Sequence, residues 1–242
     1  MENKRSLLIC DHIDITDKIK IRIPSVREIL ENEQFYYSLI TSLTATPYQY
    51  MVQLDDAGMD FTKVNDYTLF RMLFPIYGQT DMSILFGDLY TKDYISCALN
   101  DNHTPVLYSK KNGCDYIIDE FVYTKIVDAI RRINDLERVK YKAGNEAARI
   151  YLLEKARKKQ KRNARKPYVP YLEKLIIALV NKQEFKYNYE QSLDLSIFKF
   201  TQSVKQIQHT VTFDKLMIGV YSGTVDTSKM ADKSNLSWIQ TK

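Results

Sequence analysis

The sequence of 242 residues predicts an α+β protein that is predominantly α-helical, with a helical C-terminal half and small antiparallel β elements in the N-terminal half. Two observations lead to this prediction. After residue 119, apolar residues recur almost everywhere at helical spacing, whereas short strand-like runs bounded by turn residues occur only before it. The change suggests two regions, residues 1–118 and 119–242, and the sequence leaves open whether they form one continuous domain.

The first β element is expected near the N-terminus. Residues 18–23 alternate as Lys-Ile-Lys-Ile-Arg-Ile, which predicts a half-buried strand that ends at Pro24. The apolar run at residues 7–10 is the expected partner strand, because a polar turn separates the two segments. The sequence therefore favours a small hairpin at the start of the chain.

Helices are expected between this hairpin and residue 93. Residues 25–28, Ser-Val-Arg-Glu, form a capping box, and the helix that they begin is predicted to continue until Pro47 stops it. Shorter helices are expected near residues 48–54 and 65–75, the second ending at a proline. Residues 83–89 are compatible with one more short helix.

A three-stranded antiparallel meander is the strongest β prediction. Its strands are expected at residues 94–99, 104–108 and 114–118. Asn112-Gly113 lies between the last two strands, and this dipeptide favours the type I′ turn of a tight hairpin.

The chain after Asp119 is predicted to be helical in five successive segments. The apolar stripes that predict these helices, and the residues that interrupt them, are as follows: Val122 to Leu136; Glu146 through Ile150 and Leu153 into a basic stretch bounded by Pro167 and Pro170; Leu172 to Val180; Leu193, Ile197, Phe200, Val204 and Ile207 as a coiled-coil-like seam; and Phe213 to Tyr221, closed by Gly223. The tail after residue 224 is polar, with Leu236, Trp238 and Ile239 as its expected anchors.

Positive charge is concentrated in one place. Residues 154–166 carry a net charge of +7, which leaves the rest of the chain mildly acidic within a total of +5. Bases occur all round this predicted helix, so no face of it is expected to be buried. The stretch could be a solvated helix, a site for an acidic protein, or a nucleic-acid site, although no aromatic residues are interleaved for base stacking. Its eight bases are Lys155, Arg157, Lys158, Lys159, Lys161, Arg162, Arg165 and Lys166.

The sequence offers little chemistry. Cys10, His12, Cys97, His103 and Cys114 are the only candidate metal set, but zinc usually takes its ligands as close pairs such as Cys-x2-Cys, so we expect the cysteines to pack in the core. No nucleotide-binding loop or zinc-protease motif occurs. We therefore expect no catalytic residue, no metal and no cofactor, hence no enzyme.

Three acids near Gly58 present a local conflict. Asp55, Asp56 and Asp60 fit no calcium loop, and acids at the end of a helix oppose the helix dipole. They are interpreted as solvated acids at a helix end, with a docking surface as the alternative.

Composition also limits the class of protein. At 45% hydrophobic and 27% charged, the chain is typical of a globular protein. No apolar run approaches the roughly 18 residues that span a membrane, and the run at residues 7–10 is too short for a signal peptide. Three cysteines favour a reducing compartment. We therefore expect a cytoplasmic protein that does not contact membranes.

Segments spread over most of the chain resemble one group of proteins. They are Val26–Leu30, Tyr50–Leu54, Ile130–Asn134, Tyr168–Asn181, Phe185–Tyr187, Phe200–Gln208, Leu216–Asp226 and Asn235–Ile239. In this order they are similar to tail-module proteins of tailed bacteriophages that infect Gram-positive hosts, of the tail assembly chaperone type. The abundance of Lys, Ile, Asn and Tyr also fits an AT-rich genome.

This resemblance implies a non-enzymatic assembly factor that contacts tape-measure or tail-tube proteins in the host cytoplasm. The chain is longer than a compact helical chaperone and carries strands, so a baseplate or tail-tip component of the virion is the alternative. A nucleic-acid-binding protein using residues 155–166 is a third possibility. The expected partner-binding residues are the eight bases and Trp238, as the polar tail or the basic helix is expected to be left free for a partner.

Overall fold

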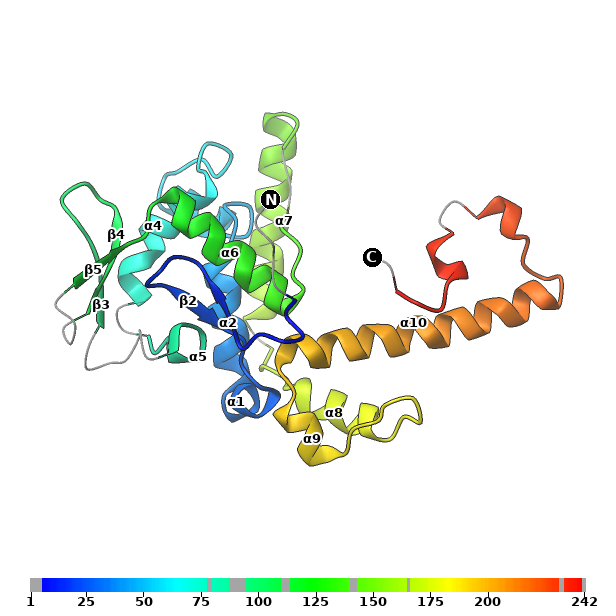
Figure 1. Ribbon diagram of the computed structural model, residues 1–242. Coiled ribbons are helices and arrows are strands. Elements are labelled where there is room, and N and C mark those ends of the chain that lie inside the picture. The colour runs from blue at the N-terminus through cyan, green and yellow to red at the C-terminus, as the bar shows by residue number, and fades with distance from the viewer. Residues whose placement is uncertain are drawn as a thin grey trace.

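The computed structural model describes residues 6–77, 80–87, 95–109, 114–139, 143–164, 166–230 and 233–240. It confirms a predominantly helical α+β fold whose two small sheets lie in the N-terminal half (Figure 1). The elements, in chain order, are β1 (His12–Asp14), β2 (Lys20–Arg22), α1 (Val26–Glu31), α2 (Glu33–Leu43), α3 (Met51–Asp56), α4 (Asp66–Tyr77), α5 (Ser83–Phe86), β3 (Ile95–Leu99), β4 (Pro105–Ser109), β5 (Cys114–Ile117), α6 (Glu120–Asn134), α7 (Glu146–Asn163), α8 (Leu172–Val180), α9 (Tyr189–Asp194) and α10 (Ile197–Tyr221), followed by the 3₁₀ turns η2 (Thr227–Lys229) and η3 (Ser234–Leu236).

The N-terminal hairpin pairs different residues from those predicted. β2 pairs antiparallel with β1 at residues 12–14, so the prediction of a strand at residues 7–10 was wrong. The reason is the tightness of the turn, in which the Ile15 amide donates to the Ile19 carbonyl oxygen at 2.9 Å, so that only the residues just before it can reach β2. Ile19 and Ile21 are buried, as their alternation predicts.

The meander β3-β4-β5 confirms the second β prediction. Both strand pairs are antiparallel, and Leu107 of β4 stands between Cys97 and Tyr116. The Asn112-Gly113 turn lies outside the described residues. The sheet is at the opposite end of the molecule from the free end of α10 (Figure 1).

The predicted capping box is present, but the helix that it begins is short. The Ser25 hydroxyl accepts from the Glu28 amide at 3.2 Å, and a Glu28 carboxylate oxygen accepts from the Ser25 amide at 2.8 Å. The helix then breaks at Asn32, which ends α1 and caps α2 by accepting from the Phe35 amide. The prediction of one continuous helix was therefore wrong, because the asparagine side chain competes with helical hydrogen bonding.

A large hydrophobic core draws on residues from Leu7 to Val204 and so takes side chains from both sides of residue 118. α6 contributes Ile126, Ile130 and Ile133, all fully buried, from its predicted stripe, whereas Leu136 is exposed. A second, smaller cluster joins α3, α4 and α7; its buried members are Ala45, Met51, Val52, Leu54, Phe61, Leu69 and Leu152.

α10 begins at an antiparallel backbone bridge between two distant segments. Ser25 pairs with Ser196, because the Val26 amide donates to the Leu195 carbonyl oxygen at 2.9 Å and the Ile197 amide donates to the Pro24 carbonyl oxygen at 2.8 Å. Ser25 caps α1 and Ser196 caps α10, so both helices begin at this bridge. The bridge thus fixes the start of α10 against the N-terminal region.

α10 is one helix of 25 residues, where the sequence indicated a seam followed by a separate stripe. The seam is also interrupted, since Leu193 lies in α9 and the chain is extended at Leu195 before Ser196 caps the next helix. Ile197, Phe200 and Val204 of the predicted seam are buried.

Glu33 provides a second link between the two parts of the chain. This carboxylate is buried, with 6% of its surface exposed, and one oxygen accepts from the Tyr168 hydroxyl at 2.8 Å and from the Tyr171 amide at 2.9 Å. It also accepts from the Leu172 amide at 3.2 Å, so it caps α8, which has no side-chain cap of its own. Because Glu33 is also the first residue of α2, its charge lies at the positive ends of two helices.

The Tyr168 hydroxyl remains a donor to this carboxylate at physiological pH. The Tyr168 side chain is 40% exposed. Its pKa is raised to about 12, mainly by desolvation and secondly by the hydrogen bond to Glu33.

Removal of the Glu33 carboxylate is expected to destabilise the whole fold. Glu33→Ala leaves amide donors of α8 without an acceptor and should lower the free energy of unfolding by about 2–4 kcal/mol, whereas Glu33→Gln keeps one acceptor oxygen and should cost about 1 kcal/mol. Urea denaturation measures both changes. Glu173→Ala, which removes an exposed acid from the first turn of the same helix, is the control and should cost no more than about 0.5 kcal/mol. Equal effects of Glu33→Ala and Glu173→Ala would contradict this role.

Candidate partner-binding surfaces

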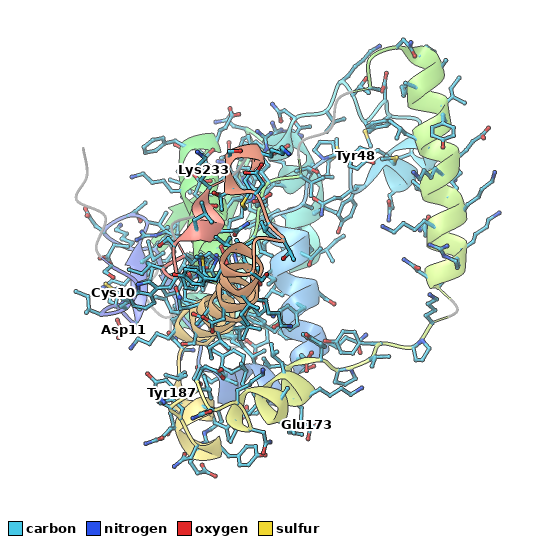
Figure 2. The ribbon with its side chains drawn as sticks, turned by 90° about the vertical axis from the view of Figure 1, so that its right-hand side faces the viewer. Cys10, Asp11, Tyr48, Glu173, Tyr187 and Lys233 are labelled. Atoms are coloured by element: carbon cyan, nitrogen blue, oxygen red, sulfur yellow. The ribbon has the colours of Figure 1, made fainter. Side chains whose placement is uncertain are left out.

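α7 is the basic helix that the sequence predicts. Asn145 begins it by accepting from the Ala148 amide at 2.8 Å, and Arg149 pairs with Glu146 at 2.6 Å in its first turns. Leu152 is buried in the smaller cluster against α3, beside the region where Figure 2 labels Tyr48. The N-terminal half of α7 is therefore attached to the body.

One base of the stretch has a structural partner. Arg157 pairs with Asp55 at 2.7 Å and with Asp56 at 2.6 Å, at the end of α3. These hydrogen bonds, the one with Asp56 being the stronger influence, raise the pKa of Arg157 above its ordinary value. The pairs neutralise the acids that oppose the dipole of α3, which resolves the conflict seen in the sequence. Asp60 instead accepts from the Thr62 amide and hydroxyl.

The prediction that no face of the basic stretch is buried holds for its described residues, of which Ala156 and Arg157 alone are partly covered. Every described residue from Lys158 to Ala164 is exposed, as are Lys155 and Lys166. Arg165 lies outside the described residues. In Figure 2 this end of α7 stands apart from the other helices before the chain returns to α8. Six of the eight bases therefore form an exposed basic segment, which we define as Lys155, Lys158, Lys159, Lys161, Arg162 and Lys166.

Aromatic side chains flank the basic segment, although no aromatic residue occurs within it. Tyr151 is 62% exposed and lies one turn before Lys155 on the outward side of α7. Tyr171 is 64% exposed at the start of α8. The charge run alone does not indicate this arrangement, because both tyrosines lie outside it in the sequence.

The second candidate surface is the arm, which we define as residues 205–240. No described residue after Val204 is buried. Figure 1 shows α10 leaving the body and the tail folding back along it. The arm is therefore a projecting helix that its own tail covers in part.

The tail is attached to α10 mainly through its backbone. The Gln206 side-chain amide nitrogen donates to the Trp238 carbonyl oxygen at 2.7 Å. The side-chain carbonyl oxygen of Gln206 accepts from the Gln240 backbone amide at 3.1 Å. His209 Nε2 donates to the Ser237 carbonyl oxygen at 2.7 Å. The Trp238 ring is 60% exposed and Ile239 is 49% exposed, so these apolar side chains do not anchor the tail as the sequence indicated.

The chain reverses after α10 at two glycines. Gly223 has a φ of 72°, which closes the helix as predicted. Gly219 allows the tail to approach closely, since a Cβ built there would lie 2.8 Å from a methyl carbon of Val225. Near this turn, Ile218 and Tyr221 are 70% and 85% exposed.

The candidate metal residues do not form a cluster where the structure describes them. Cys10 is a free thiol, His12 contacts Asp11 at 2.5 Å, and His103 lies in the turn between β3 and β4. The side chains of Cys97 and Cys114 lie outside the described residues. In the part of the chain that the structure describes, no three His, Cys, Asp or Glu side chains are arranged to hold a metal ion.

A pocket of about 730 Å³ lies where α4 and α7 begin. Its charged side chains pair with one another, Asp66 with Arg138 at 2.9 Å and Glu146 with Arg149 at 2.6 Å. The first pair joins α4 to the segment after α6, and the second lies within the first turn of α7.

None of the helices formed by the described residues is long and apolar enough to cross a membrane.

Residues 158–241 match the family model of the YomV second domain. The match begins where α7 becomes fully exposed and includes α8, α9, α10 and the tail. The family is phage-derived, which suggests that this chain is a phage protein. No curated protein and no solved structure matches the chain.

Arg157 is expected to hold α7 against α3. Arg157→Gln should make the backbone amides of residues 152–157 exchange with solvent deuterium faster, because Asp55 and Asp56 lose their partner at the end of α3. Hydrogen exchange read by mass spectrometry measures this change. Lys159→Gln removes the same charge from an exposed position and should leave these amides unchanged; equal acceleration by both substitutions would exclude the proposed contact.

Proposed function

We propose that this protein is a non-enzymatic bacteriophage tail assembly factor, of the tail assembly chaperone type, and that it binds tail proteins through the arm. The observation that carries the proposal is the absence of any buried residue among the described positions after Val204. Burial of apolar surface is the main stabilising contribution to folding. None of the described side chains of the arm is fully buried as those of the core are. A partner that covers α10 would supply it.

The composition of the arm fits a protein partner. Between residues 206 and 223 the only charged residues are Asp214 and Lys215, with the remainder apolar or uncharged. Protein interfaces are depleted of charge at their centre and enriched in aromatic residues and methionine. Phe213, Met217 and Tyr221 are of these types. An amphipathic helix of a tape-measure protein, or a tail-tube subunit, is the partner that we propose.

The match to a phage-derived domain supports the phage setting, because it covers the whole arm. We propose that the protein acts in the host cytoplasm and by contacts alone. Mass spectrometry of purified virions tests whether it leaves the tail after assembly: a chaperone should be absent from particles, whereas a baseplate or tail-tip component should be present in fixed stoichiometry.

Removal of residues 224–242 is expected to abolish binding to tail proteins, because it takes away the exposed Trp238 and Ile239 side chains that the arm presents beside α10. The truncated chain should keep its melting temperature within a few degrees, since none of the described residues that it loses is buried. Co-purification of tagged protein with co-expressed tape-measure or tail-tube protein measures binding, and circular dichroism measures the melt. Loss of folding on truncation would instead make the tail part of the core.

A matched pair of double substitutions tests the arm without truncation. Ile218→Ser with Tyr221→Ser should weaken capture of the tail protein at least tenfold, because it removes two exposed apolar side chains from α10. Ile177→Ser with Tyr187→Ser removes a similar exposed pair from the α8 region and should leave capture unchanged. Equal capture by both variants and wild type would contradict the proposal.

A further inference from the structure

We propose that the exposed basic segment of α7 binds double-stranded DNA through its phosphates, without reading the sequence. This surface lies apart from the arm and is built by a different helix, so the inference is independent of the proposed function.

The first observation is charge without counter-charge. Between residues 154 and 163 the only acid is Glu154, and the nearby acids Asp55 and Asp56 are occupied by Arg157. Among the described residues, no carboxylate pairs with Lys155, Lys158, Lys159, Lys161 or Arg162, while Glu146 pairs with Arg149. Like charges three or four residues apart repel one another along a helix, and this segment contains several such pairs. A polyanion relieves that repulsion.

The second observation is access. Every described residue from Lys158 to Ala164 is exposed, so this end of α7 has no covered side. Figure 2 shows it standing clear of the body. An α-helix is about 10–12 Å across, which matches the roughly 12 Å width of the major groove of B-form DNA. The groove of an A-form RNA duplex is too narrow and deep for side chains to enter in this way.

The third observation distinguishes DNA from an acidic protein. Protein interfaces depend on buried apolar or aromatic anchors, and residues 158–164 contain no apolar side chain larger than Ala164. Phosphate contacts require only bases and amide donors, which Gln160 and Asn163 add to the segment. Single strands require a series of stacking side chains, whereas the exposed Tyr151 and Tyr171 only flank the segment and no aromatic residue lies within it. Duplex DNA is therefore the ligand that fits.

Fluorescence anisotropy with a labelled DNA duplex of random sequence tests the inference on the full chain. We expect the duplex to bind. The logarithm of the association constant should fall linearly with the logarithm of the salt concentration, with a slope of about −4 to −5 for five phosphate contacts. Replacing Lys158, Lys159, Lys161 and Arg162 by Gln should weaken binding about a hundredfold at low salt and reduce the slope by about 4. The matched variant Lys174→Gln, Lys182→Gln, Lys186→Gln, Lys215→Gln should bind within about twofold of wild type, and unchanged circular dichroism melts show that both variants fold.

Three results would overturn the inference: no binding by wild type at low salt, an equal loss in the two quadruple variants, or competition by poly-glutamate or by single-stranded DNA as strong as that by duplex. The chain that ends at residue 223 lacks the tail but keeps α7, so it should bind duplex as wild type does. Failure of arm-dependent capture and failure of DNA binding are thus separate outcomes.

Discussion

The backbone bridge between Ser25 and Ser196 determines the arrangement of the molecule. It places the first residue of α10 beside the first residue of α1, so Ile197, Phe200 and Val204 enter the main core while the rest of the helix must continue outward. Glu33 fixes the neighbouring helix in the same way, by capping α8 from α2. Both contacts join segments more than 130 residues apart, and together they attach the α8–α10 region to the N-terminal region.

Two surfaces follow from this arrangement. A helix of 25 residues extends about 37 Å, and only its first part is buried, so the arm projects as a helix whose own tail covers it incompletely. Most helical stability in proteins comes from packing of an apolar face, so we propose that a partner stabilises the projecting part of α10. α7 is attached by Leu152 and by the ion pairs of Arg157, and beyond them its bases are free of the body. The first surface carries few charges on its helix and exposes several apolar side chains, whereas the second is polar and strongly basic.

Much of the local structure could be predicted from the sequence, because it depends on neighbouring residues. The capping box at Ser25, the meander of β3-β4-β5 and the closure of α10 at Gly223 are of this kind. The breaks at Asn32 and Ser196 could not be, since apolar spacing continues through both and only the side-chain caps and the long-range bridge interrupt it. For the candidate site, the charge run was visible, but the pairing of Arg157 with Asp55 and Asp56 joins residues a hundred positions apart. Apolar periodicity likewise predicts a helix over residues 213–221 without showing that its apolar side lacks a core to enter.

α10 leaves the core at Val204 and continues as an arm, so its two parts differ in environment within one helix. Hydrogen exchange along this helix measures where the core ends. The structure predicts that amides of the turns around Phe200 and Val204 exchange only when the whole protein unfolds, whereas amides of residues 208–221 exchange much faster, through local opening. Uniform protection from Phe200 to Tyr221 in the isolated protein would show that the arm is part of the core, and would contradict this account.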